Sequence, residues 1–148
     1  MSALTDLYQE VILDHNKSPR NFREPDTFNR DAIGHNPLCG DRIRLYLQVE
    51  EGRIVDVSFQ GSGCAISQAS ASLMTVALMG LTVEEFETLF ARFHSLVTGK
   101  IVEASQDDLG KLVVFGGVSQ YPVRVKCATL PWHTLRAALN HTENATTE

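Results

Sequence analysis

The 148-residue chain is 43% hydrophobic and 21% charged, which is typical of a soluble globular protein and excludes a wholly disordered one. Its net charge of −5 argues against a nucleic-acid binder, which needs a positive face to displace phosphate counterions. The sequence shows neither a long apolar run nor a basic, apolar leader, so we expect no membrane span, no signal peptide and a cytoplasmic location. We expect residues 1–148 to form a single domain.

The first predicted element is an amphipathic helix over residues 2–15. One face of this helix is apolar at helical spacing, at Leu4, Leu7, Tyr8, Val11 and Ile12. Pro19 and Pro25 follow, and because proline disrupts regular structure, residues 16–32 are predicted to be an irregular connection.

A β-hairpin is predicted next, because the apolar period changes from that of a helix to that of a strand. Apolar residues alternate with polar ones at Ile43, Leu45, Leu47 and Val49. The turn falls at Glu50-Glu51-Gly52, where glycine accepts a positive φ. The return strand, residues 53–60, is predicted to place Val55, Val57 and Phe59 on one face.

Two helices are predicted after the hairpin. The first follows Gly61-Ser62-Gly63 and ends at Gly80. The second begins with the pattern Thr82-Val83-Glu84-Glu85, which predicts a capping box, and ends near Gly99. In the box, the threonine side chain accepts the amide three residues on and the glutamate reaches back.

The last third of the chain is less regular. Asp107 or Asp108 is predicted to cap a short helix that runs through Phe115 and ends at Gly116-Gly117. The last helix is predicted over residues 123–140, with a kink or restart at Pro131 because proline has no amide to donate. Residues 141–148 are predicted to be a frayed tail.

The predicted fold class is α+β, with a small antiparallel β-sheet packed against four to five α-helices. Into this fold the sequence places three cysteines, each where chemistry is plausible. Cys39 lies in a polar loop before the first strong strand, Cys64 opens a helix, and Cys127 lies near the start of the last helix. A free cysteine is often only a small buried hydrophobe, and for Cys64 and Cys127 this reading stays open. The polar, turn-like loop around Cys39 favours a shared metal site.

A set of soft thiolates suits zinc, copper(I) or an iron–sulfur cluster, and zinc takes four ligands. Asp41, His35 and His133 are the candidates for the fourth ligand. Asp41 is the best of them, because in an extended segment it points the same way as Cys39, two residues before it. For the remaining histidines, His15, His94 and His141, we expect surface or partly packed positions.

At these residues the sequence resembles the U-type iron–sulfur cluster assembly family, whose fold is shared by IscU and the N-terminal part of NifU. The matching segments span nearly the whole chain in the family's order: 7–15, 36–41 (Asn-Pro-Leu-Cys-Gly-Asp), 61–72 and 124–132. Lys126 stands where scaffolds of the IscU type carry a histidine, and a Leu-Pro-Pro-Val-Lys chaperone motif is absent. These two features, and an extra segment around residues 98–120 that IscU-type scaffolds lack, are similar to the SufU branch of the family.

That resemblance implies a zinc ion held by Cys39, Asp41, Cys64 and Cys127. It also implies a SufS-type, pyridoxal-phosphate-dependent cysteine desulfurase as partner. The expected function is zinc-dependent sulfur transfer, in which Cys39 accepts persulfide sulfur and passes it to downstream Suf scaffold proteins or apo iron–sulfur proteins. The chain would then be a sulfurtransferase partner of the desulfurase rather than a stand-alone enzyme. Arg124, one helical turn before Cys127, either offsets the negative charge of the site or is a solvated helix-face arginine.

Two other functions stay open from the sequence. The same thiols permit a scaffold on which a [2Fe–2S] cluster, or iron alone, is bound before transfer, although Lys126 in place of histidine weakens this reading. A purely structural zinc domain is the third reading, and the polar, glycine-flanked Cys39 loop argues against it because structural zinc sites are closed.

Overall fold

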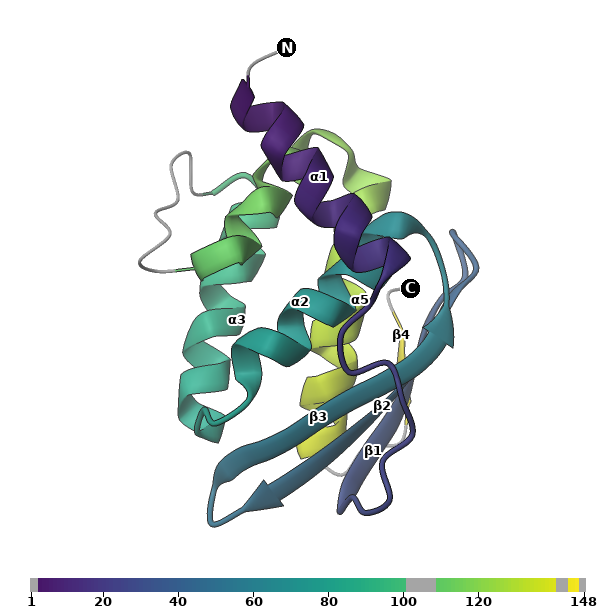
Figure 1. Ribbon diagram of the computed structural model, residues 1–148, viewed down its shortest axis with the longest axis vertical. Coiled ribbons are helices and arrows are strands. Elements are labelled where there is room, and N and C mark those ends of the chain that lie inside the picture. The colour runs from purple at the N-terminus through teal and green to yellow at the C-terminus, as the bar shows by residue number, and fades with distance from the viewer. Residues whose placement is uncertain (1–2, 101–108, 141–143, 147–148) are drawn as a thin grey trace.

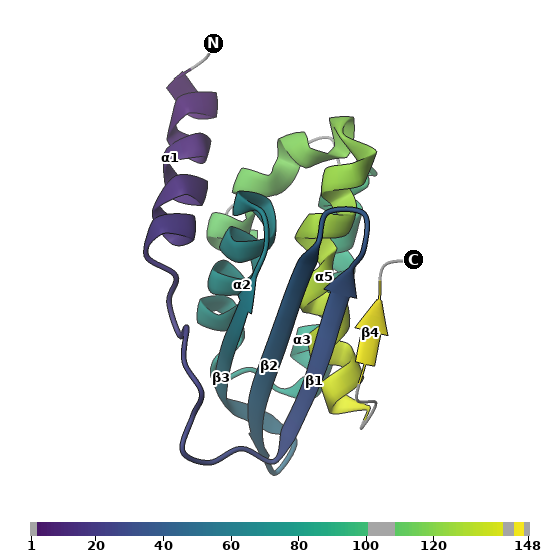
Figure 2. The same cartoon turned by 90° about the vertical axis from the view of Figure 1, so that its right-hand side faces the viewer.

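The computed structural model describes residues 3–100, 109–140 and 144–146, with side chains for residues 9–100 and 109–140. In chain order the elements are α1 (Ala3–Lys17), β1 (Arg30–Asn36), β2 (Asp41–Glu50), β3 (Arg53–Ser62), α2 (Ala65–Leu78), α3 (Val83–Val97), the 3₁₀ helix η1 (Gly110–Gln120), α5 (Pro122–Leu139) and β4 (Asn144–Thr146). Figures 1 and 2 show one sheet with helices gathered on one of its faces. The predicted α+β class is confirmed.

The sheet has the strand order β3-β2-β1-β4. β1, β2 and β3 pair antiparallel, and the short β4 pairs parallel to β1. The predicted β2–β3 hairpin is present, and both Glu51 and Gly52 take the positive φ of a tight hairpin turn. A register shift after Gln48 leaves Val55 exposed and turns Ile54 into the core instead. The prediction that Val55 shares a face with Val57 and Phe59 is therefore wrong.

The first residues of β1 lie within residues 16–32, which the sequence predicts to be an irregular connection. Its residues facing the helices are small or polar, Ala32, Gly34 and Asn36, so the strand shows no apolar alternation. Gly34 is required here, because a Cβ atom on it would lie 1.9 Å from Oγ1 of Thr134 in α5. This close approach lays α5 directly across β1 (Figure 2).

The core lies between the sheet and the helices and is rich in aromatic rings. Trp132 of α5 stacks on Phe93 of α3 with ring centroids 4.6 Å apart, and Phe115 of η1 packs edge-on against Phe93. The capping box predicted at Thr82 is present, with both of its hydrogen bonds to Glu85.

His15 is more buried than the sequence predicts, since a surface or partly packed position is expected for it. The side chain is buried at the end of α1, and its Nδ1 lies 2.7 Å from Oγ of Ser72 in α2. The same hydroxyl accepts the backbone N–H of Arg20. His15 therefore fixes the point where α1 meets α2.

The last third of the chain differs from the prediction in three places. η1 continues through Gly116 and Gly117, neither of which has the positive φ that ends a helix. α5 runs unbroken through Pro131. Asn144–Thr146, predicted to be frayed, pair with β1 as β4. Asp107, Asp108 and His141 lie outside the described residues, and among those described no helix is long and apolar enough to cross a bilayer.

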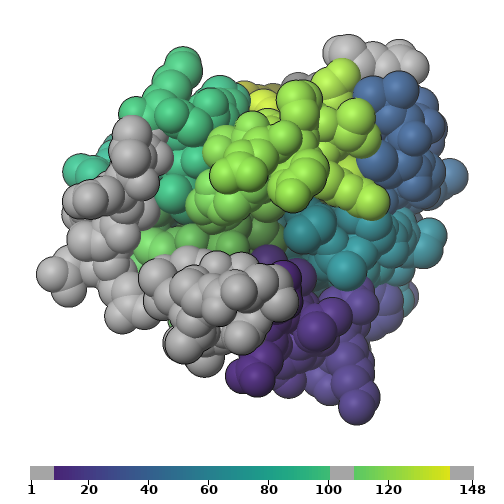
Figure 3. Space-filling model, turned by 90° about the horizontal axis from the view of Figure 1, so that it is seen from above, coloured from purple at the N-terminus to yellow at the C-terminus, as the bar shows by residue number. Residues whose placement is uncertain are grey.

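Several chain segments meet at the end of the sheet that Figure 3 views from above. The β1–β2 turn, the end of β3 and the start of α2 meet there because Asn36 pairs with Asp41 and Arg42 pairs with Ser62. The first turns of α5 reach the same end, since Asn36 contacts Cys127. These segments carry all three cysteines.

Candidate metal centre

Each predicted ligand is placed by a different local structure. Cys39 lies on the β1–β2 turn, where Gly40 takes a φ of 71° and lets the chain reverse before Asp41 opens β2. Cys64 is the N-cap of α2, and its sulfur accepts the N–H of Ser67 at 3.4 Å. Cys127 lies in the second turn of α5, with its side chain fully buried.

The structure brings these four residues together. The ligand atoms of Cys39, Asp41 and Cys127 all lie within 4.8 Å of one another, and the Cys39 and Cys127 sulfurs are 3.2 Å apart. Cys64 joins this group through Asp41: Oδ1 accepts the Cys64 N–H at 2.8 Å, and Oδ2 lies 4.0 Å from the Cys64 sulfur. The pattern is that of a single thiol-and-carboxylate cluster.

Burial sets the electrostatics of the cluster. Burial is the main reason that the pKa of Cys127 is raised above its usual range, and contacts with Cys39, Asp41 and Cys64 add to it. The nearby Cys127 side chain is the main cause that raises the pKa of the Arg124 guanidinium. Arg124 itself is exposed, one helical turn before Cys127.

The cluster fits a bound metal ion. Asp41 is fully buried, yet its side-chain hydrogen-bond partners in the described residues are the Cys64 amide and thiol and the Asn36 side chain, with no cationic side chain. A buried carboxylate normally has a counter-charge, and a cation held with the three sulfurs supplies one. Three thiols with one carboxylate suit zinc and also suit iron.

The other predicted candidates lie elsewhere. His35 is exposed on β1, paired with Arg42. His133 packs edge-on against Phe90 of α3 with ring centroids 5.1 Å apart, and burial lowers its pKa. Asp41 therefore stays the candidate for the fourth ligand, although Cys39 and Gly40 lie in a turn rather than in the extended segment that the sequence predicts.

Two residues of the centre are missed by sequence reasoning. Gly63 lies against Asp41: a Cβ atom on it would be 2.6 Å from Oδ1. Asn36 is fully buried, and its amide donates to Oδ2 of Asp41 and to the Cys127 sulfur. Gly63, directly before Cys64, is a sequence signal for a close approach at this position. Asn36, directly before Pro37, looks like an ordinary turn residue and gives no such signal.

The fold is a sheet covered on one face by helices. Three thiols and a carboxylate converge at one end of it, and this arrangement is typical of a small protein with a thiol-based metal site. Comparison with known proteins specifies the class further, because the profile of the NifU-like N-terminal domain matches residues 7–140. The chain belongs to this family, whose IscU and SufU members are iron–sulfur cluster assembly proteins.

Two relatives illustrate the range of this family. The zinc-dependent sulfurtransferase SufU of Bacillus subtilis is 42% identical over 134 residues, covering 89% of this chain and 88% of SufU. The iron–sulfur cluster assembly scaffold protein IscU of Streptococcus pyogenes serotype M1 is 38% identical over 145 residues, covering 98% of this chain and 90% of IscU.

Solved structures agree with the fold. The SufU structure from Fervidobacterium islandicum AW-1 superposes with a TM-score of 0.82 at 37% identity, covering 94% of this chain and 99% of that one. The N-terminal NifU-like protein of Brucella abortus gives the same TM-score of 0.82 at 22% identity, which supports the fold alone.

Proposed function

We propose that this protein is a zinc-dependent sulfurtransferase in which Cys39 accepts sulfur from the persulfide of a SufS-type cysteine desulfurase. The observation that carries the proposal is the asymmetry of the three thiols. Cys127 is fully buried and Cys64 caps a helix, whereas Cys39 lies half-buried on a turn beside the exposed Leu38. Among the described residues, no N–H group donates to the Cys39 sulfur.

In this function Cys39, Asp41, Cys64 and Cys127 hold the zinc ion, which when bound favours the deprotonated form of the thiols. The Cys39 thiolate attacks the terminal sulfur of the partner's persulfide. The S–S bond of the partner breaks, a new S–S bond forms on Cys39, and the partner's cysteine leaves as a thiolate. The persulfide proton stays with the transferred sulfur, so no oxidant or reductant is consumed.

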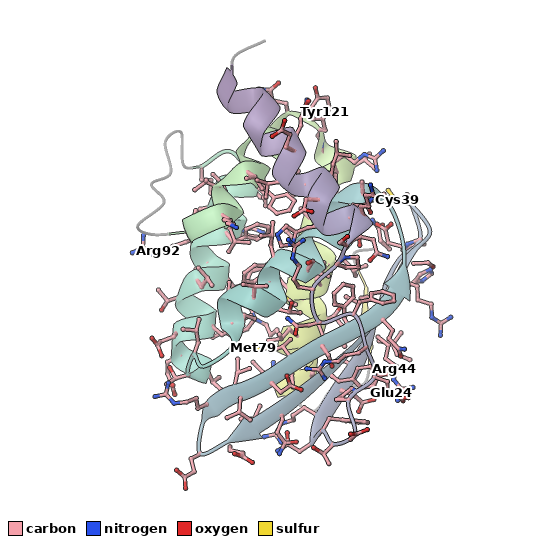
Figure 4. The ribbon with its side chains drawn as sticks, viewed as in Figure 1. Glu24, Cys39, Arg44, Met79, Arg92 and Tyr121 are labelled. Carbon is pink, nitrogen blue, oxygen red and sulfur yellow. The ribbon has the colours of Figure 1, made fainter. Side chains whose placement is uncertain are left out.

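The surface around Cys39 supports docking of a protein partner. Leu38 next to Cys39, and Tyr121 and Val123 at the start of α5, are all exposed by half or more of their surface. Figure 4 shows Tyr121 and Cys39 at the same end of the molecule. A cavity of about 440 Å³ lies beside them, between α1, η1 and the start of α5, with Ile12 and Arg124 among its lining residues. Clustered exposed apolar side chains are typical of an interaction site.

The similarity to the zinc-dependent sulfurtransferase SufU of Bacillus subtilis supports zinc as the metal and sulfur transfer as the activity. Lys126 also favours this function over a cluster scaffold, because an ammonium group cannot replace the histidine ligand of IscU-type scaffolds. The receivers of the sulfur are downstream Suf scaffold proteins or apo iron–sulfur proteins.

The test is cysteine desulfurase turnover, followed as alanine release, with and without the purified metal-bound protein. We expect strong stimulation that is lost in Cys39→Ala and retained in Val55→Ala, an exposed position at the hairpin end of the sheet. Stimulation by Cys39→Ala equal to that by the wild type would refute Cys39 as the acceptor.

A second candidate function is a scaffold for a [2Fe–2S] cluster. The observation in its favour is the identity of 38% and 39% to the IscU scaffold proteins of Streptococcus pyogenes and Thermotoga maritima. Anaerobic reconstitution with iron and sulfide separates the two functions. A stable chromophore that transfers to an apo-protein, together with no effect on the desulfurase, would establish the scaffold.

A further inference from the structure

Asn36 is a buried side chain that the proposed sulfur transfer does not use. It ends β1, and its amide group lies directly beneath the Cys39 turn, fully excluded from solvent. Its Nδ2 donates to Oδ2 of Asp41 at 3.3 Å and lies 3.5 Å from the Cys127 sulfur. One amide group therefore touches two of the four proposed ligands, from different segments of the chain.

The other end of the same amide has no partner. Within the described residues, Oδ1 of Asn36 accepts no hydrogen bond although it is buried. An unpaired buried carbonyl costs stability, so a residue selected only to fill this space would be apolar. The turn itself does not need the side chain either, because the Cys39 N–H is accepted by the backbone carbonyl of Asn36. The two N–H contacts are what remains to explain an asparagine here.

Those contacts divide the ligands into two groups. Asp41 accepts from Asn36 and from the Cys64 amide, Cys127 accepts from Asn36, and Cys64 accepts from Ser67. The sulfur of Cys39 accepts the S–H of Cys127 at 3.2 Å but, among the described residues, accepts no N–H. A hydrogen bond from N–H fixes a thiolate in position and spreads its charge, which makes it less reactive.

We propose that Asn36 is the positioning residue of the metal centre: its amide holds Asp41 and Cys127 as permanent ligands and leaves Cys39 as the exchangeable thiol. This inference rests on the metal centre of the proposed function and not on sulfur transfer itself. Asn36 acts through Asp41 and Cys127 and does not bind the metal.

The test uses zinc and cobalt(II) alone, with the full chain. Asn36→Leu keeps the approximate size of the side chain and removes the N–H donors. We expect zinc affinity, measured by competition with a chelator, to fall about 10- to 100-fold, as for the loss of other residues that orient metal ligands. The thiolate-to-cobalt charge-transfer band should move to longer wavelength, because a sulfur that loses its N–H donor gives up an electron more readily.

Ser72→Ala is the matched control. Ser72 is also fully buried and takes part in hydrogen bonds with His15 and Arg20, but it contacts none of the four ligands. This variant should lower the urea midpoint of the metal-free protein while leaving zinc affinity and the cobalt band unchanged. If Asn36 only stabilised the fold, Asn36→Leu would behave like Ser72→Ala: it would lower the urea midpoint and leave zinc affinity and the cobalt band unchanged.

Zinc affinity within twofold of the wild type, with an unchanged cobalt band, would overturn the proposal. Should Asn36→Leu fail to fold, Asn36→Ala, which is smaller and also lacks a donor, is judged by the same two measurements. Neither measurement involves a desulfurase. A wild-type protein that fails to stimulate the desulfurase would refute the proposed function and leave the role of Asn36 standing.

Discussion

At the scale of single residues, a Cβ atom built on Gly63 would lie 2.6 Å from Oδ1 of Asp41, closer than real side chains approach such an atom. Gly63→Ala should therefore push the buried carboxylate out of place. We expect zinc affinity to fall at least tenfold, and the metal-free protein to lose about 1–3 kcal/mol through overpacking. Chelator competition and urea unfolding measure the two effects.

Gly117→Ala is the control for this substitution, since nothing lies within 4 Å of its added methyl group. It should change neither quantity appreciably. Equal zinc affinity in Gly63→Ala and Gly117→Ala would mean that Asp41 tolerates displacement and is not a ligand.

His15 should make the stability of the metal-free protein depend on pH. Burial is the main cause that lowers its pKa, opposed by Asp14 and reinforced by Arg20 and Lys111 around it. The unfolded chain then binds the proton more readily, so the free energy of unfolding should fall as the pH drops below about 6.5. His133, which is half-buried and also has a lowered pKa, acts in the same direction.

His15→Gln should flatten this slope between about pH 7.5 and pH 5 in urea titrations, and adding His133→Gln should flatten it further. An unchanged slope in the double variant would show that other groups govern acid stability.

The four proposed ligands can be predicted from the sequence, because cysteines flanked by glycine, a helix start and cations are visible locally. Asn36 and His15 cannot. The role of each depends on a partner more than fifty residues away, Cys127 for the first and Ser72 for the second. Local chemistry marks an asparagine before proline as a turn residue and a histidine near a helix end as solvated.

At the scale of elements, the start of α3 offers a test that leaves the metal centre alone. Thr82 accepts the Glu85 N–H at 3.1 Å, and Glu85 accepts the Thr82 N–H at 3.0 Å. Thr82→Ala should cost about 1 kcal/mol of unfolding free energy, with no change in zinc affinity. Thr88→Ala, exposed within the same helix, is the control and should cost less. A reduced zinc affinity in Thr82→Ala would show that α3 and the metal centre are coupled.

The elements that the sequence predicts well are those with a periodic apolar face and a clear start, such as α3 and the β2–β3 hairpin. β1 is not predicted because Gly34 and Asn36 occupy inward positions that ordinarily carry apolar residues. Their small size and polarity serve α5 and the metal centre rather than the sheet. The extent of η1 is missed for a related reason, since Gly116 and Gly117 stay within the helix.

At the scale of the whole molecule, the aromatic core around Trp132 and Phe93 is built from helices rather than from the ligand residues. Removing the metal with a chelator should therefore lower the melting temperature without unfolding the protein. Free zinc at one hundred times its dissociation constant should add about 2.7 kcal/mol to the unfolding free energy. Far- and near-ultraviolet circular dichroism of the metal-free protein tests whether its secondary structure and side-chain packing persist without the metal. Complete loss of both signals would identify a structural zinc domain instead.

The fold class is predictable because a single hairpin pattern stands between one helical pattern and a run of later ones. The parallel pairing of β4 with β1 is not predictable. Asn144–Thr146 are too few to show a period, and their strand depends on β1 already being in place.

The sulfurs of Cys39 and Cys127 touch although 88 positions separate them in the chain. Cys127 lies in the last helix, so a nascent chain that has not yet released α5 from the ribosome can offer at most two of the three thiols. A metal ion bound at that stage would lack the buried ligand that closes the centre. Loading of the proposed metal centre therefore requires that α5 has been synthesised and has packed against β1.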